Sequence, residues 1–275
     1  KDKKVQKAAE EALRAVFEKS DEWSAGYCLP MLKKGLDTKA KPQQKEVCLS
    51  IIEKFAKDNE KGIAREIDWL CHPIVFLMND IKASVKKAAK SCMAAIVACS
   101  GNKDLEPFQP VVIKANEALK NVPESVEKLA GCIFVQNVEA PALSVLLPVL
   151  WRGLNDKSES VIRRCCVIID NMCKLVDDER EGKPLLAEIY PLMQKKAEEI
   201  SDPEARETAG KTLATMKKIA DAQVDTSDIV VRELLVQFGA MVMAEDEEVD
   251  YLDLTAKKLS AAKIEDVAVW KRALG

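Results

Sequence analysis

The chain has 275 residues, a length that fits one or two globular domains or a single elongated repeat domain. Apolar residues make up 48% of it and charged residues 32%, which excludes a fully disordered chain. A formal net charge of −3 excludes a global attraction to nucleic acid, although charges can still segregate onto one face. Only 10 glycines and 5% aromatic residues favour helices over sheets.

The cysteines and the apolar stretches indicate the compartment. The nine cysteines form an odd set without the spacing of a secreted disulfide framework, and most lie in apolar helical patterns. We therefore expect reduced core residues. No signal-peptide pattern opens the chain, and its most apolar stretch, 143–151, is too short to cross a bilayer. A cytoplasmic protein with no membrane partner is expected.

In chain order, apolar periodicity predicts a lone amphipathic helix at 3–19 and helical hairpins at about 24–59, 62–100, 105–137, 139–177 and 182–222. A proline recurs in the first helix of each hairpin at intervals of 43, 37, 38 and 43 residues, which gives a period of about 40. These prolines are Pro30, Pro73, Pro110, Pro148 and Pro191. Each lies within an apolar helical pattern, so we expect it to bend a helix rather than end it.

The hairpins also resemble one another in sequence. Residues 29–37 realign with residues 147–155, a shift of three periods. An Asp in the turn, as at Asp80 and Asp156, and an Arg early in the second helix, as at Arg163, are typical of HEAT units. The predicted fold is therefore an all-α solenoid of HEAT-type helical hairpins.

Short signals mark the helix ends and one domain boundary. Gly101 and Gly182 are expected at helix ends, and the segment 201–204 is expected to start a helix. The repeat rhythm stops after Ala222, where a polar linker precedes an apolar helix from about residue 228 and an acidic run at 245–253. We predict a solenoid over 1–222, and a linker with the start of a small helical bundle over 223–275.

The residues that an active site needs are mostly missing. His72 is the only histidine, and no Cys-x-x-Cys pair accompanies it, so a structural core role is predicted for it and for Cys71. The segment Gly210-Lys211-Thr212 resembles the end of a phosphate loop, but Ala205 occupies the first glycine position and no strand precedes it. No enzyme activity, metal or cofactor is therefore predicted. The four tryptophans, Trp23, Trp69, Trp151 and Trp270, are expected to be packing residues rather than a base-stacking platform.

Basic residues offer a candidate binding ridge. They gather at the hairpin 139–177 and again at the turn of the hairpin 24–59, where they could meet RNA phosphates or an acidic protein face. An ordinary solvated stripe is the alternative interpretation. The candidate contacts are Arg152, Lys157, Arg163, Arg164 and Lys174, together with Lys33, Lys34 and Lys41.

Three segments, 152–155, 167–176 and 201–207, closely resemble the N-terminal HEAT domain of the elongation factor 3 family. The similarity is strongest over about 139–220, and 228–275 resembles part of the helical bundle of that family. The resemblance implies docking on rRNA and proteins of the small ribosomal subunit, in support of elongation and of tRNA release from the exit site. Other translation factors are further candidate partners. It implies ATP binding only in two ABC-type cassettes, which this chain lacks. A monomer is expected.

A protein scaffold is the alternative function. A general-control-activator-like HEAT region, or a phosphatase- or transport-type solenoid, would bind partner proteins through apolar contacts rather than rRNA. An enzyme is the third reading, and no motif in the chain supports it.

Overall fold

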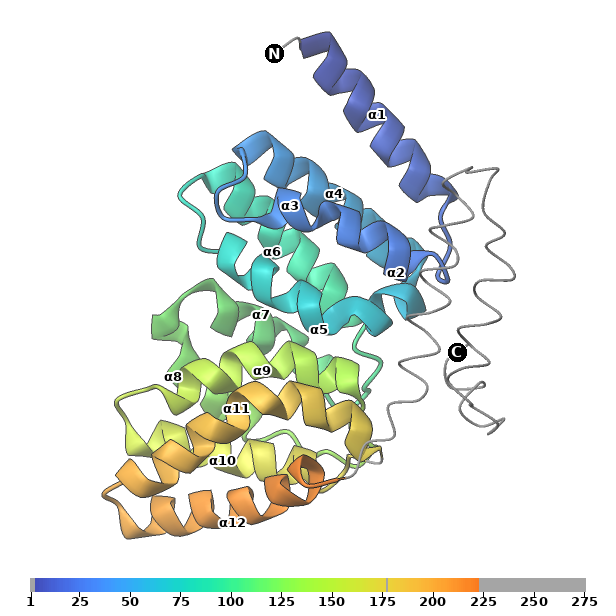
Figure 1. Cartoon of the computed structure of the whole chain (residues 1–275). Coiled ribbons are helices and arrows are strands. Elements are labelled where there is room, and N and C mark those ends of the chain that lie inside the picture. The colour runs from blue at the N-terminus through green and yellow to red at the C-terminus, as the bar shows by residue number, and fades with distance from the viewer. Residues whose placement is uncertain (1–2, 177, 223–275) are drawn as a thin grey trace, which may run out of the picture. The chain divides into compact units, whose positions relative to one another are not determined.

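The computed structural model describes residues 3–176 and 178–222. All of them belong to the first of the two units into which the chain divides at Ala222. Every regular element in these residues is helical, and the elements follow one another as hairpins (Figure 1). The all-α solenoid of HEAT-type hairpins is thus confirmed. The predicted linker, the helix from residue 228 and the acidic run lie outside the described residues.

The hairpins follow the predicted order closely. A lone helix, α1 (Lys3–Lys19), comes first. The first hairpin contains α2 (Ala25–Cys28), the 3₁₀ helix η1 (Leu29–Leu32), α3 (Lys33–Leu36) and α4 (Pro42–Asp58), and the second contains α5 (Glu60–Leu77) and α6 (Ala83–Ala98). The third contains η2 (Glu106–Phe108), α7 (Gln109–Glu117), η3 (Leu119–Asn121) and α8 (Val122–Leu129). The fourth pairs α9 (Ala140–Leu154) with α10 (Glu159–Cys173), and the fifth pairs α11 (Glu179–Glu199) with α12 (Pro203–Ala220).

The repeating prolines have two different roles. Pro73, Pro148 and Pro191 lie inside α5, α9 and α11, as predicted. The prediction is wrong for Pro110, which lies in the first turn of α7. The backbone N–H groups of a first turn have no acceptor within the helix, so a proline costs no hydrogen bond there. The prediction is also wrong for Pro30, because the first helix of its hairpin is divided there into α2, η1 and α3.

Packing between hairpins is regular except at the third. Among the second helices, α4 packs on α6, and α10 packs on both α8 and α12. Among the first helices, α5 packs directly on α9 and α9 on α11. The helices of the third hairpin, α7 and α8, have only nine and eight residues. Because α7 is so short, the first helices of the second and fourth hairpins meet beside it.

Equivalent glycines explain part of the sequence repeat. A Cβ atom at Gly35 would overlap the sulfur of Cys48, and one at Gly153 would overlap the sulfur of Cys165. Each glycine therefore lets the first helix of its hairpin approach the second closely. The realigned segments 29–37 and 147–155 share this close contact.

The two glycines predicted at helix ends, Gly101 and Gly182, have separate explanations. Gly101 follows α6 with a φ of 70°, the left-handed conformation in which glycine ends helices, as predicted. Gly182 lies inside α11, so the prediction of a helix end is wrong there. A Cβ at Gly182 would lie 3.1 Å from the side chain of Ile219, and the missing side chain lets α12 approach α11.

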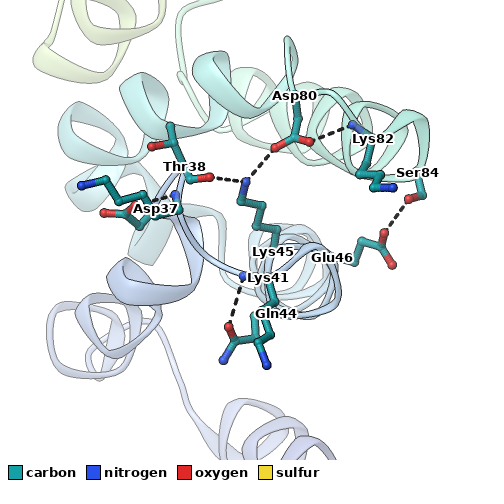
Figure 2. A network of polar contacts seen from close by, with 10 residues as sticks. Asp37, Thr38, Lys41, Gln44, Lys45, Glu46, Asp80, Lys82 and Ser84 are labelled. Atoms are coloured by element: carbon teal, nitrogen blue, oxygen red, sulfur yellow. Dashed lines mark hydrogen bonds and ion pairs between the residues drawn. The ribbon is translucent and has the colours of Figure 1, made fainter.

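A buried ion pair joins the first two hairpins. The Lys45 ammonium in α4 lies 2.7 Å from Asp80 Oδ2, in the turn between α5 and α6, and donates a hydrogen bond to the Thr38 carbonyl at 2.6 Å (Figure 2). Only 5% of the lysine side chain and 12% of the aspartate side chain are exposed. This network fixes the turn of one hairpin against the turn of the next.

Candidate binding surfaces

The predicted basic ridge on α10 is built into contacts between helices. The Arg163 guanidinium pairs with Glu204 of α12, and the Arg164 guanidinium lies 3.3 Å from Glu127 of α8. The two arginines point to opposite neighbours because adjacent residues of a helix differ in direction by about 100°. Their charges are offset by carboxylates, so they are poorly placed to attract phosphate.

Lys174, at the end of α10, is also paired. Its ammonium lies 2.6 Å from the Asp170 carboxylate, one helical turn earlier. The same carboxylate accepts a hydrogen bond of 2.6 Å from the Thr215 hydroxyl of α12. Lys174 therefore belongs to the packing of the fourth hairpin on the fifth.

Arg152 has a structural position rather than an exposed one. Its Nη1 lies within hydrogen-bond distance of the Asn116 carbonyl, at 3.2 Å, and of the Ala115 carbonyl, at 3.4 Å. These carbonyls end α7 and have no partner within the helix. Burial lowers the pKa of the half-buried guanidinium. The arginine caps the negative end of the short helix α7.

The remaining candidates are exposed. Lys33 lies in α3 with its ammonium 4.5 Å from the ring centre of Trp69, and Lys34 follows it. Lys41 precedes α4, and its backbone N–H donates to Gln44 Oε1 at 3.3 Å (Figure 2). Lys157 lies in the turn between α9 and α10. The structure therefore does not bring the eight predicted residues together into one site.

A different basic surface follows from the turns themselves. The turns that join the two helices of the first four hairpins lie along one edge of the stack, on the left in Figure 1. Each of these turns carries at least one exposed lysine. We call this surface the turn edge, and it consists of Lys39, Lys41, Lys82, Lys120 and Lys157.

Aspartates shape these turns and leave the lysines exposed. The carboxylates of Asp37, Asp80 and Asp156 each accept a hydrogen bond from the backbone N–H two residues later, at 2.7, 2.9 and 2.9 Å. Such Asx turns engage the carboxylate with the backbone. Within residues 3–176 and 178–222, no carboxylate pairs with an ammonium group of the turn edge.

Sequence reasoning identified only part of this surface. Lys41 and Lys157 were predicted as contacts, and Lys39 belongs to the same predicted basic turn as Lys41, whereas Lys82 and Lys120 were missed. The available signal was the repeated Asp-x-Lys pattern, present at 37–39 and at 80–82. Lys120 has no such pattern, because the turn of the third hairpin is built by η3.

A groove opens on the first helices of three hairpins. This first-helix groove has a volume of about 480 Å³ and is lined from α5, α9 and α11. It forms where α5 meets α9 beside the short third hairpin. The residues that line it and bear on its chemistry are Asp68, Trp69, His72, Phe76, Leu147, Trp151, Arg152 and Glu188.

Several residues that were predicted to be buried are exposed, two of them in this groove. His72 is exposed, with its ring 5.0 Å from that of Phe76, so the predicted core role is wrong. Its neighbour Cys71 takes the core-facing position of α5 and is buried. Trp151 is 51% exposed and Trp23 is 57% exposed, which contradicts a packing role for both. Trp69 packs half-buried against the core, as predicted, and Trp270 lies outside the described residues.

The described residues show where the cysteines and the other candidate chemical groups lie. No three His, Cys, Asp or Glu residues among them gather to hold a metal. The predicted burial of the cysteines is confirmed for all but Cys28, which is half-buried, and burial raises the pKa of Cys166 and Cys173 to about 12. The segment at 210–212 is helical, as predicted, and the Thr212 hydroxyl lies buried, 3.0 Å from the Cys166 carbonyl. None of the described helices is long and apolar enough to span a membrane.

Comparisons with known proteins agree with this geometry. The family described as Elongation factor 3/GNC1 HEAT repeat matches residues 120–227, and the family described as EF3 N-terminal HEAT repeat matches residues 1–93. Elongation factor 3 of Phytophthora infestans is 34% identical over 251 residues, which are 91% of this chain and 22% of that protein. Elongation factor 3B of Saccharomyces cerevisiae is 34% identical over 82% of this chain and 22% of its own length. The chain spans about a fifth of the length of these relatives.

Proposed function

This chain belongs to the HEAT-repeat family of elongation factor 3, and from that premise we propose that it docks a translation factor on the ribosome. The proposed target is rRNA, with adjoining proteins, on the small subunit. In this proposal the chain is a cytoplasmic binding module without catalysis of its own. ATP hydrolysis and support of exit-site tRNA release would then depend on ABC-type cassettes elsewhere in a longer protein.

The observation that carries this proposal is the turn edge. Its lysines project from successive turns of one stack, and packed helices follow one another at about 10 Å. Their ammonium groups have no carboxylate partners among the described residues, so their charge is available to phosphates. Contacts to backbone phosphates release counterions and make binding strongly salt-dependent. The arginines of α10, in contrast, already hold carboxylates of α8 and α12.

The test is co-sedimentation of the chain with purified small ribosomal subunits across a salt series. We expect binding that weakens steeply with salt, by about 0.7 to 0.9 in log–log slope for each phosphate contacted. Replacement of all five turn-edge lysines by glutamine should abolish binding at moderate salt. The substitutions lie on exposed turns, so the helical content measured by circular dichroism should not change.

A charge-matched control separates position from total charge. It replaces five other exposed lysines by glutamine. These are Lys195, Lys211, Lys217 and Lys218 on α11 and α12, together with Lys54 of α4. This variant carries the same net charge as the turn-edge variant and should still bind. Equal loss in both variants would contradict a specific turn edge. Binding that does not change with salt concentration would instead favour the protein-scaffold function.

A further inference from the structure

The first-helix groove presents aromatic side chains that the core does not use. Phe76 is 57% exposed and Trp151 is 51% exposed, on two helices that pack against each other. Leu147 and Trp69 also belong to the apolar lining of the groove. A large exposed apolar surface in a concave site is typical of a surface that becomes covered by a partner.

The neighbouring first hairpin also exposes apolar side chains. Tyr27 of α2 is 45% exposed and Met31 of η1 is 66% exposed. Their hairpin packs on α5 through α2, and the Lys33 ammonium of α3 rests on the ring of Trp69, which lines the groove. The first hairpin therefore adjoins the groove at Trp69.

Charge at the groove identifies the occupant. The carboxylates of Asp68 and Glu188 are exposed at the groove, and neither has a basic partner among the described residues. The two nearby cations contact other groups instead of these carboxylates, since Lys33 lies over the ring of Trp69 and Arg152 holds the carbonyls that end α7. Two unpaired carboxylates repel phosphate and attract cations. Exposed indole and phenyl faces also attract guanidinium and ammonium groups.

We propose that the first-helix groove binds a protein segment in which apolar side chains are flanked by arginine or lysine. The apolar side chains fill the space between Phe76 and Trp151, and the flanking cations meet Asp68 and Glu188. An amphipathic helix with a basic edge satisfies both requirements in the helix-in-groove mode. This site is lined by first helices, whereas the turn edge lies on the turns, so the two surfaces can be tested separately.

The test selects peptides from a random phage-displayed library on the folded chain, and then measures the selected synthetic peptides by fluorescence anisotropy. We expect enrichment of apolar residues next to Arg or Lys. Trp151→Ala should weaken the selected peptides by about tenfold or more, as expected for an aromatic residue at the centre of an interface. The matched control is Trp23→Ala, which removes a tryptophan of similar exposure that does not line the groove and should leave affinity unchanged.

Charge reversal gives a second and sharper readout. In Asp68→Lys/Glu188→Lys, the basic peptides should lose affinity, and twin peptides with Glu in place of Arg and Lys should gain it. The proposal is overturned if the selected peptides lack basic residues, or if their affinity is the same for the wild type and for both groove variants. It is equally overturned if oligo-uridine displaces them from the groove, or if Trp151→Ala abolishes self-association of the chain. Ribosome binding by the groove variants and peptide binding by the turn-edge variant should be unaffected.

Discussion

At the residue scale, the repeated glycines make the sharpest stability prediction. Gly153→Ala places a methyl group against the sulfur of Cys165, and we expect it to destabilise the chain by about 1–3 kcal/mol through overpacking. Gly210 lies in the interior of α12 with open space around it, so Gly210→Ala should stabilise the chain by about 0.5–1 kcal/mol. Urea unfolding followed by circular dichroism measures both changes.

A double mutant tests the reason given for the glycine. Cys165→Ala removes the sulfur that the new methyl group would meet, so Gly153→Ala should cost clearly less in that background. If the two changes are simply additive, helix propensity or another contact determines the role of Gly153. The same experiment with Gly35 and Cys48 should give the same sign, because that pair has the same geometry.

The buried pair of Lys45 and Asp80 predicts a pH dependence. The hydrogen bond from Lys45 holds the pKa of Asp80 below its usual value of 3.8. The unfolded state therefore binds the proton more readily. The pair contributes its full stability at pH values above 3.8 and loses it as the pH falls through the lower pKa of the folded state. Asp80→Asn should remove this acid dependence and cost about 3–5 kcal/mol, because it leaves Lys45 buried without its counter-charge.

The matched control removes both charges. In Lys45→Met/Asp80→Asn no uncompensated charge remains buried, so most of the lost stability should return. Thermal unfolding at pH 7 and at pH 3 measures the wild type, Asp80→Asn, Lys45→Met and the double variant. If the stability of Asp80→Asn falls with acid as much as that of the wild type, other carboxylates cause the pH dependence.

At the element scale, the short helix α7 depends on a residue from another hairpin. Nine residues are too few for a helix to be stable alone, and its last carbonyls are held by Arg152. Arg152→Gln should therefore raise amide hydrogen exchange in α7 and in the following turn more than elsewhere. Arg164→Gln, which breaks an exposed pair with Glu127, is the control and should change exchange little. Equal amide hydrogen exchange of α7 in the two variants would argue against the role of Arg152 as the cap of this helix.

The elements were predictable where a local pattern decides them. The period of about 40 residues and the spacing of apolar residues predicted α1 and the five hairpins. Pro73 and Pro148 were correctly placed inside helices. Pro30 and Pro110 were not, because local sequence does not show whether the residues before a proline stay helical or end in a turn.

At the scale of the whole molecule, the turn edge should act as a set of similar contacts. Replacing one lysine, such as Lys82 or Lys120, by glutamine should lower the salt slope of ribosome binding by about 0.7 to 0.9 for a lysine that contacts a phosphate. Binding should weaken by similar amounts for each lysine in contact. A single replacement that abolishes binding at every salt concentration would indicate one specific contact instead of a distributed edge.

The sequence by itself determined the all-helical fold, the hairpin period, the burial of most cysteines and the resemblance to elongation factor 3, because these depend on spacing along the chain. Only the tertiary structure decided which charges are available, since Arg152, Arg163 and Arg164 find their partners 36 to 41 residues away. The first-helix groove also required three dimensions. It exists because the short helix α7 lets α5 pack against α9, and a sequence pattern carries no distance between helices of different hairpins.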